Sequence, residues 1–396
     1  MTSATSLTTD IRGAAAIVGV ADEVSPTGVI DVPLRELEAR VITTALADAG
    51  LSLSDVDGLC TCTGGTLMHS VELAEYLGIA PRFTDATQTG GSSYGLYVEH
   101  AAAAIAAGAA ETVVIVYAST PRAARKRGEK GLGIFATPER LEWETPFGVM
   151  LPISAYALAA NRHMATYGTT ATQLAQIAVD TRRWAAMNPR AHLREEITVD
   201  EVLESGFIAE PLHKLECCLV TDGAAALVIT SAERARNLAG RSAFVLGAAS
   251  AASHAMISQM PDLTVTPAAV SGPAAFKAAQ LNPSDIDVVQ LYDSFTITVL
   301  LALEDLGFCP KGDGGPFVGD GALGPGGILP GQTTGGGLAY THPGAFGAFL
   351  LVEATRQLRG ECADRQVPGA QTAVAHGTGG VLSATSTVIL GTEATL

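Results

Sequence analysis

Residues 43–59 read TTALADAGLSLSDVDGL, and residues 274–291 read AAFKAAQLNPSDIDVVQL. Each stretch has the apolar spacing of a helix, followed by a turn and the beginning of a strand. The motif SDVD at 54–57 returns as SDID at 284–287, at the same place in that order. Two parts of one chain with the same local order indicate an internal duplication.

Other segments extend both parts of the repeat. Residues 96–119 predict a helix of small residues and then an apolar strand, and residues 222–229 (DGAAALVI) predict another strand. In the second part, residues 348–360 predict a helix, and residues 372–391 predict two strands around a glycine turn. Alternating helices and buried strands predict an α/β fold with mostly parallel sheets.

The chain divides into a predicted N-terminal half, residues 1–240, and a predicted C-terminal half, residues 241–396. The first half contains a predicted insertion at about 120–215, with helices such as 170–187. Residues 312–337 hold twelve glycines in 26 residues, too many for a helix. We expect a loop there that lets a ligand approach the backbone, with a plain flexible loop as the alternative.

Composition limits the classes of function. The chain has 396 residues, of which 47% are hydrophobic and 16% charged, and its net charge is −16. An acidic protein of this kind is not expected to bind nucleic acid, because neutralising phosphates requires basic patches. A local basic run holds Arg122, Arg125 and Lys126, which we predict as contacts for a coenzyme A (CoA) phosphate. A solvated, charged surface is the alternative.

The six cysteines form no C-x-x-C pair, and Cys60-x-Cys62 has no second Cys or His pair near it. No secretion signal and no apolar run of about 18 residues is present. We therefore expect a reduced, cytoplasmic protein with no metal site and no membrane insertion.

Two C-terminal segments carry groups suited to proton transfer: residues 291–296 (LYDSFT) and residues 338–344 (LAYTHPG). The first follows the end of a buried strand, where α/β sheets place ligand sites. Together with the duplication, the insertion and DGAAALVI, these motifs resemble those of the sterol-carrier-protein-type thiolases, over nearly the whole chain. Within them the sequence is most similar to the bacterial lipid-transfer-protein-type aldolases of steroid side-chain degradation.

The resemblance implies a thiolase fold, in which two duplicated α/β halves form α-β-α-β-α layers. The thiolase nucleophile is a cysteine at the start of a helix, and here the matching segment is GGSSYG at 90–95, with Gly91 or Ser92 in its place. The second thiolase cysteine is matched by His376. Because a serine hydroxyl needs a base whereas a cysteine thiolate is available near neutral pH, acyl-enzyme chemistry is not expected.

The remaining catalytic motifs are altered in a different way. The family's His-Asp-Cys-Phe motif has Tyr292 in place of histidine, and the Gly-His-Pro motif keeps His342 with Tyr340 two residues earlier. We predict Tyr292, Tyr340, His342 and His376 as the catalytic residues, and we expect the two tyrosine hydroxyls to converge on one cavity, with the histidines also as candidate oxyanion donors. Candidate substrate or oxyanion contacts are Asp293, Ser294, Gly379, Gly380 and Ser92, and His254 is a further candidate for CoA.

These groups suit a retro-aldol cleavage of a β-hydroxyacyl-CoA, in which the thioester becomes an enolate that is then protonated. The resemblance implies a steroid with a tertiary hydroxyl at ring carbon 17, cleaved to a 17-ketosteroid and propionyl-CoA. It implies no cofactor beyond the CoA of the substrate. It also implies a homodimer bound to a small OB-fold partner, which gives a heterotetramer.

Alternatives of other classes remain open. The chain can be a non-catalytic acyl-CoA or lipid-binding subunit that keeps the fold, or a thiolase-like acyltransferase acting through Ser92. Residues 91–95 (GSSYG) also match the hydrolase pattern G-x-S-x-G. No strongly apolar strand precedes that segment, so hydrolysis is disfavoured.

Overall fold

The computed structural model describes residues 11–63, 67–129 and 137–396. Within these residues, nine strands form one hydrogen-bonded sheet in the order β3-β2-β4-β7-β1-β8-β11-β10-β9. The central strands β1 and β8 pair only at Ala16–Phe244 and Ile17–Ala243. The sheet therefore consists of two parts that meet at one short contact, and each part belongs to one half of the chain.

The first part has the order β3-β2-β4-β7-β1. Strand β7 runs antiparallel to β1 and β4, whereas β2 runs parallel to β4 and β3. The elements are β1 (Ala15–Val24), β2 (Gly58–Cys60), β3 (Phe83–Asp85), β4 (Thr112–Ser119), β7 (Gly223–Ser231), α1 (Leu34–Asp48), α2 (His69–Leu77), α3 (Ser93–Ala106) and α9 (Ala232–Asn237).

The second part, β8-β11-β10-β9, has the same order as the first part read from β1 to β2. In each part, the first strand of that half along the chain is followed in the sheet by the last strand, then the last but one, then the second. Strand β11 runs antiparallel to β8 and β10, and β10 runs parallel to β9. The elements are β8 (Ala243–Ala252), β9 (Val288–Leu291), β10 (Thr372–Gly379), β11 (Ala384–Gly391), α10 (Ala268–Ala279), α11 (Thr296–Asp305), α12 (Gly314–Gly319) and α13 (Gly347–Arg359).

The predicted duplication and the α/β class are confirmed, but the expectation of mostly parallel sheets is wrong. In each half the last strand pairs antiparallel with both of its neighbours. In the second half the reason is direct, because only four residues join β10 to β11, and a connection this short permits only an antiparallel pair.

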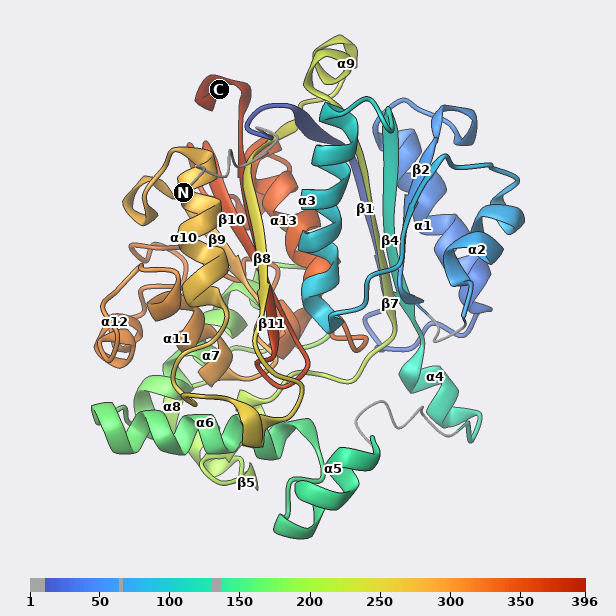
Figure 1. Ribbon diagram of the computed structural model, residues 1–396. Coiled ribbons are helices and arrows are strands. Elements are labelled where there is room, and N and C mark those ends of the chain that lie inside the picture. Colours follow the sequence, from blue (N-terminus) through green and yellow to red (C-terminus); the bar gives the residue numbers. More distant parts are fainter. Residues whose placement is uncertain (1–10, 64–66, 130–136) are drawn as a thin grey trace, which may run out of the picture.

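Five layers result, as Figure 1 shows. Helix α1 covers the outer face of the first part, and α10 covers the outer face of the second. Helices α3 and α13 lie between the two parts and contact strands of both. Ten of the 14 residues of α3 and twelve of the 13 residues of α13 are buried, as expected for helices enclosed by sheets.

The repeated SDxD motif has the same structural task in each half. Asp55 accepts a hydrogen bond from the Ser52 N–H and closes a helical turn, and Asp285 does the same with Asn282. Two residues later, Asp57 accepts from the N–H groups of residues 111 and 112, and Asp287 accepts from those of residues 371 and 372. The second aspartate of each motif thus fixes the start of the strand that pairs with β2 or β9 in the sheet, which is β4 or β10.

A further correspondence lies at the first strand of each half. A Cβ atom on Gly19 of β1 would lie 2.1 Å from the Ala45 carbonyl oxygen of α1. A Cβ atom on Gly247 of β8 would lie 2.3 Å from the Ala275 carbonyl oxygen of α10. Both glycines adjoin a register shift in their strand, and both let the outer helix approach the sheet closely.

The insertion between β4 and β7 is mainly helical and lies below the layers in Figure 1. Buried side chains of the insertion bond to the second half. The Trp184 indole donates to the Leu323 carbonyl, and the His163 imidazole pairs with the Glu304 carboxylate on α11. Its elements are α4 (Pro121–Lys126), α5 (Pro138–Trp143), α6 (Pro152–Tyr167), α7 (Ala171–Ala186), α8 (Val199–Glu204), β5 (Phe207–Ala209) and β6 (Leu212–His213).

The glycine-rich segment is not entirely loop, and the expectation that it excludes a helix is wrong. Six of its residues form α12, and two of the glycines in this helix lie where close packing leaves no room for a side chain. A Cβ atom on Gly314 would lie 2.7 Å from Glu304, and one on Gly315 would lie 2.5 Å from Gln173. Residues 336–340 then form a wide helical turn that leads to His342. Among the described residues, no helix is long and apolar enough to cross a membrane.

Candidate active site

Tyr292 and His342 form a hydrogen-bonded pair. Tyr292 directly follows β9, and His342 lies in the loop after the turn at residues 336–340. The Tyr292 hydroxyl lies 2.9 Å from Nε2 of His342, and it accepts a hydrogen bond of 3.1 Å from the Phe346 N–H. If the hydroxyl proton points to His342, one lone pair of the oxygen remains for a ligand.

Burial sets the charge of both members of this pair. It raises the pKa of Tyr292 well above its usual value, and it lowers the pKa of His342 to about 4. Backbone hydrogen bonding at His342 acts in the opposite direction but does not outweigh burial. At neutral pH the pair is therefore a neutral phenol beside a neutral imidazole, and neither side chain is charged.

Gly91 faces this pair where the thiolase resemblance places the nucleophile. A Cβ atom on Gly91 would lie 2.2 Å from Cε2 of Tyr292 and 2.6 Å from the Thr378 carbonyl oxygen. The Tyr292 ring thus fills the space that a side chain at position 91 would need. Ser92 is turned away, because its hydroxyl donates to the Thr89 carbonyl at 2.7 Å. Ser92 does not line the cavity, which argues against the expectation that it contacts substrate.

A cavity of about 470 Å³ opens in front of Tyr292 and His342. Its volume lies within the range of small-molecule sites, and its lining is predominantly apolar. Glycine backbone from both halves lines part of it, and the insertion lines another part. Residues of the insertion that line it include Leu151, Pro152, Ile153, Tyr156 and Ile208, and further lining residues are Cys218, Ser294, Phe295, Gly379 and Gly380.

Asp293 lies behind the cavity and holds the loop that carries His342. Its carboxylate accepts hydrogen bonds from the N–H groups of Gly337, at 2.7 Å, and Leu338, at 3.2 Å. Burial raises the pKa of Asp293 to about 7. Ser294 does line the cavity, and its hydroxyl lies 3.0 Å from that of Thr298.

Tyr340 does not reach the cavity, so the expectation that both tyrosine hydroxyls converge there is wrong. Its hydroxyl donates to Asp22 of β1. Asp22 also forms ion pairs with Arg190 at 2.8 Å and Arg356 at 2.7 Å. Four parts of the chain meet in this cluster: β1, the insertion, the turn at residues 336–340 and α13.

His376 is also set apart from the cavity. It lies in β10 with its side chain buried, and its Nδ1 atom lies 3.0 Å from the Thr387 hydroxyl on β11. Burial lowers its pKa to about 4. Its carbonyl accepts the Tyr292 N–H at 2.9 Å, so it supports the backbone of Tyr292 and not the cavity.

A neighbouring pocket of about 670 Å³ shares Gly90, Gly379 and Gly380 with the cavity. His254 lines it, with Nε2 at 3.0 Å from the Val381 carbonyl, and Arg140 of α5 lines it as well and bonds to the Ala255 carbonyl. The predicted CoA contacts Arg122, Arg125 and Lys126 line neither space. Arg122 instead bonds to His192 at 3.1 Å, and the other two are exposed on α4.

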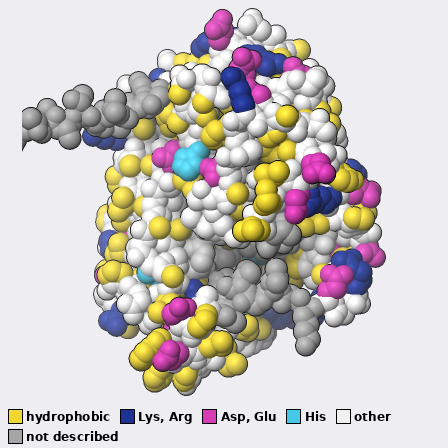
Figure 2. Space-filling view, turned by 45° about the vertical axis from the view of Figure 1, so that its right-hand side comes forward, with side chains coloured by type: hydrophobic (Ala, Val, Ile, Leu, Met, Phe, Trp, Pro, Cys, Tyr) yellow, Lys and Arg dark blue, Asp and Glu magenta, His cyan; other side chains and the backbone are white. Residues whose placement is uncertain are grey.

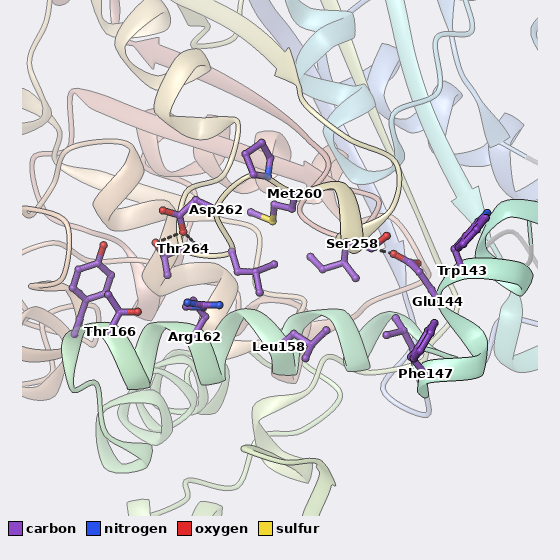
Figure 3. Close-up of a pocket in the computed structure, with 15 residues that line it drawn as sticks. Trp143, Glu144, Phe147, Leu158, Arg162, Thr166, Ser258, Met260, Asp262 and Thr264 are labelled. Carbon is purple, nitrogen blue, oxygen red and sulfur yellow. Dashed lines mark hydrogen bonds between the residues drawn. The ribbon is translucent and has the colours of Figure 1, made fainter.

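A separate pocket of about 660 Å³ lies between α6 and the segment 257–264 (Figure 3). Leu158, Arg162 and Thr166 point toward it from α6, and Glu144 accepts the Ser258 N–H at 2.9 Å. None of the predicted site residues lines it. It is larger than the cavity in front of Tyr292 and His342 but lacks that pair.

Tyr156 and Cys218 are among the cavity residues that were not predicted from the sequence. Tyr156 comes from the insertion, which has no counterpart in the repeat, and no local motif marks it. Cys218 precedes the strand DGAAALVI, a segment whose recognition could have directed attention to it. Burial raises the pKa of the Cys218 thiol, which leaves it protonated and a poor nucleophile.

Comparison with known families agrees with this architecture. The family described as "Thiolase, N-terminal domain" matches residues 22–233, and "Thiolase C-terminal domain-like" matches residues 249–392. The chain therefore belongs to the thiolase family.

Several relatives cover nearly the whole chain. A steroid side-chain-cleaving aldolase of Thermomonospora curvata is 37% identical over 97% of this chain and 99% of its own length. A 17-hydroxy-3-oxo-4-pregnene-20-carboxyl-CoA lyase of Mycobacterium tuberculosis is 36% identical over 96% and 100%. An acetyl-CoA acetyltransferase of Methanothermobacter thermautotrophicus is 34% identical over 88% and 92%. A solved structure described as "Ltp2-ChsH2(DUF35) aldolase" has a TM-score of 0.88 at 34% identity, covering 97% of this chain and 99% of that one.

Proposed function

We propose that this chain is a carbon–carbon lyase that cleaves a β-hydroxyacyl-CoA by a retro-aldol reaction. The proposed substrate is a steroid side-chain CoA thioester with a hydroxyl at ring carbon 17, and the products are a 17-ketosteroid and propionyl-CoA. Support for the steroid comes from two relatives, which are named for steroid side-chain cleavage and for a pregnene carboxyl-CoA.

One observation carries the reaction type. The Tyr292–His342 pair lines an apolar cavity. Gly91, at the position of the thiolase nucleophile, has no side chain, and the Tyr292 ring fills the space that one would need. Proton transfer needs such a pair, whereas acyl transfer through an enzyme-bound thioester needs a nucleophilic side chain at that place.

The pair can both take and return one proton. The substrate hydroxyl gives its proton to the Tyr292 oxygen while the Tyr292 proton moves to Nε2 of His342. The bond between Cα and Cβ then breaks, its electrons form the thioester enolate, and Cβ becomes a ketone. Because burial disfavours a charged imidazole, the proton returns through Tyr292 to Cα, and the resting pair is restored.

The thioester lies, in this proposal, where the cavity meets the neighbouring pocket. Backbone N–H groups at Gly379 and Gly380 are candidate donors to the enolate oxygen. The CoA arm then leaves past His254 and Arg140. His254→Ala should raise the KM for the CoA ester severalfold with kcat nearly unchanged, whereas Lys126→Ala should change neither. Equal effects of the two substitutions would contradict this route.

We also propose a homodimer that binds a small OB-fold partner as a heterotetramer, with no cofactor beyond substrate CoA. The solved relative described as "Ltp2-ChsH2(DUF35) aldolase" supports a partner protein, because its description joins two names. The insertion also presents exposed apolar side chains, among them Trp143, Phe147 and Met150, and Figure 2 shows hydrophobic groups gathered on the lower part of the molecule. Such surfaces mark interaction sites. Light scattering of the chain, alone and co-expressed with an OB-fold protein, measures both stoichiometries.

The decisive experiment incubates the purified chain, with and without the partner, with 17-hydroxy-3-oxo-4-pregnene-20-carboxyl-CoA. Mass spectrometry should find a 17-ketosteroid and propionyl-CoA in equal amounts. Thioester exchange with free CoA, without carbon–carbon cleavage, would favour an acyltransferase instead. Binding without any product would favour the non-catalytic acyl-CoA or lipid-binding subunit. Cys218→Ala should still cleave, since no cysteine is required for the proposed steps.

A further inference from the structure

Helix α6 of the insertion faces two different spaces. Leu158, Arg162 and Thr166 point into the pocket beside the segment 257–264 (Figure 3). Residues two positions apart on a helix differ in direction by about 200°. Tyr156 therefore faces away from Leu158, and it lines the catalytic cavity with 3% of its surface exposed.

The Tyr156 hydroxyl lies at the junction between the cavity and the neighbouring pocket. It donates to the Gly380 carbonyl at 3.3 Å, and Gly380 lines both spaces. The ring packs on Phe295, with ring centroids 4.6 Å apart, which fixes its direction. A hydroxyl bond of this length is weak, because such bonds are usually about 2.7–2.8 Å long. The hydroxyl can thus change acceptor at little cost when a ligand oxygen arrives.

Tyr156 remains a neutral donor at any working pH. Burial raises its pKa to about 12. Burial is the main cause of the raised pKa of Tyr292, and Tyr156 lies near enough to add to it. A neutral, aligned hydroxyl is a suitable donor to a developing oxyanion, since it adds no charge to the apolar site.

We propose that Tyr156 is a further catalytic residue, whose hydroxyl donates a hydrogen bond to the thioester oxygen while that oxygen becomes an enolate. This inference rests on the proposed function. In the reaction, the substrate hydroxyl proton passes to the Tyr292–His342 pair and the electrons of the broken bond move onto the thioester. Tyr156 keeps its proton throughout, and the pair returns its proton to Cα. The insertion thereby supplies an active-site group and does more than cover the cavity.

The test uses Tyr156→Phe, which keeps the ring on Phe295 and removes only the hydroxyl. Its matched control is Tyr167→Phe, on the same helix but outside the cavity. Two reactions are followed with the complete protein and its partner. One is cleavage of the steroid CoA ester, and the other is exchange of the α-hydrogens of propionyl-CoA in D₂O, which requires the enolate but no carbon–carbon cleavage.

Tyr156→Phe should lower kcat for cleavage by about 10²–10³-fold, the effect of removing one oxyanion donor. It should slow α-hydrogen exchange by a similar factor, with KM changed little and the shape of the pH profile unchanged. Tyr167→Phe should behave as wild type in both reactions. Wild-type rates in Tyr156→Phe would overturn the proposal, as would slow cleavage with normal exchange. A wild-type protein that neither cleaves nor exchanges would instead refute the proposed function itself, which separates the two failures.

Discussion

Tyr292 and Tyr340 come from the same half of the chain and are almost equally buried, with 4% and 2% of their surfaces exposed, yet their surroundings differ completely. The Tyr292 hydroxyl meets a neutral imidazole at the wall of a ligand-sized cavity. The Tyr340 hydroxyl meets the Asp22 carboxylate. Burial raises the pKa of Asp22, but Arg356 and Arg190 outweigh it and hold that pKa well below its usual range.

The difference shows that the partner of a tyrosine decides its role more than its place in a motif does. A hydroxyl beside a neutral base and an open cavity can exchange its proton with a ligand. A hydroxyl that donates to an arginine-paired carboxylate keeps its proton, and its hydrogen bond stabilises the fold. We therefore propose Tyr292 as the catalytic tyrosine and Tyr340 as an anchor for the loop that carries His342. The predictions below challenge this contrast, from the largest expected effect to the smallest.

Tyr292→Phe should lower kcat for cleavage by about 10²–10⁴-fold, because it removes a positioned acid and base while it keeps the ring. Thermal unfolding should change little, since the ring continues to fill the space beside Gly91. Steady-state kinetics with the steroid CoA ester measures the first effect and calorimetry the second. Near-normal turnover would erase the contrast with Tyr340 and assign the chemistry to His342 alone.

Gly91→Ala should lower kcat by about 10–10²-fold, because its Cβ atom would lie 2.2 Å from the Tyr292 ring and must displace it. The matched control is Gly240→Ala, whose nearest contact would be an ordinary 3.9 Å. A crystal structure of the Gly91 variant should show a longer distance between the Tyr292 hydroxyl and His342. Unchanged kinetics with the pair intact would show that the site tolerates a side chain there.

Tyr340→Phe should reduce turnover by less than about tenfold but cost about 1.5–3 kcal/mol of stability, the range for a hydrogen bond to a charged group. Urea unfolding measures the cost, and kinetics at a temperature well below the transition measures the activity. A loss of turnover as large as that of Tyr292→Phe, in a variant of normal stability, would place Tyr340 in the chemistry after all.

The smallest effect concerns pH. Because the pKa of His342 is lowered to about 4, its neutral form persists as pH falls and is lost only as pH passes through about 4. Turnover should therefore change less than about twofold through His342 between pH 8 and 5.5, whereas an unperturbed histidine with a pKa of about 6.5 would be mostly protonated at the lower end. A kcat profile measures this.

If kcat does change near pH 7, we assign that change to Asp293, because burial raises its pKa to about 7. The change should then be absent in Asp293→Asn. A limb near pH 6.5 that persists in that variant would contradict the assignment for His342. The same shift of His342 predicts that stability falls as pH drops from about 6.5 to 4, because the unfolded chain takes up the proton first.

The sequence by itself determined the duplication, because the SDxD repeat sets the same turn and the same strand start in each half. It also indicated the loss of the nucleophile at 91–92 and the presence of Tyr292 and His342, since these positions lie within contiguous motifs next to predicted strands. The direction of the last strand in the first half was not determined, because a strand buried on both faces is a continuous apolar run whatever its direction. In the second half, the short glycine turn between the last two strands already required an antiparallel pair.

Only the tertiary structure decided which side chains meet. Tyr340 lies two residues from His342 along the chain, but its hydroxyl reaches Asp22, 318 residues away in sequence. Ser92 lies beside Gly91 but turns back to Thr89, and Tyr156 enters the cavity from an insertion that carries no motif. A motif fixes the local backbone and the chemistry available in it. Convergence of hydroxyls, imidazoles and carboxylates depends on how distant segments pack, and no local pattern of residues contains that information.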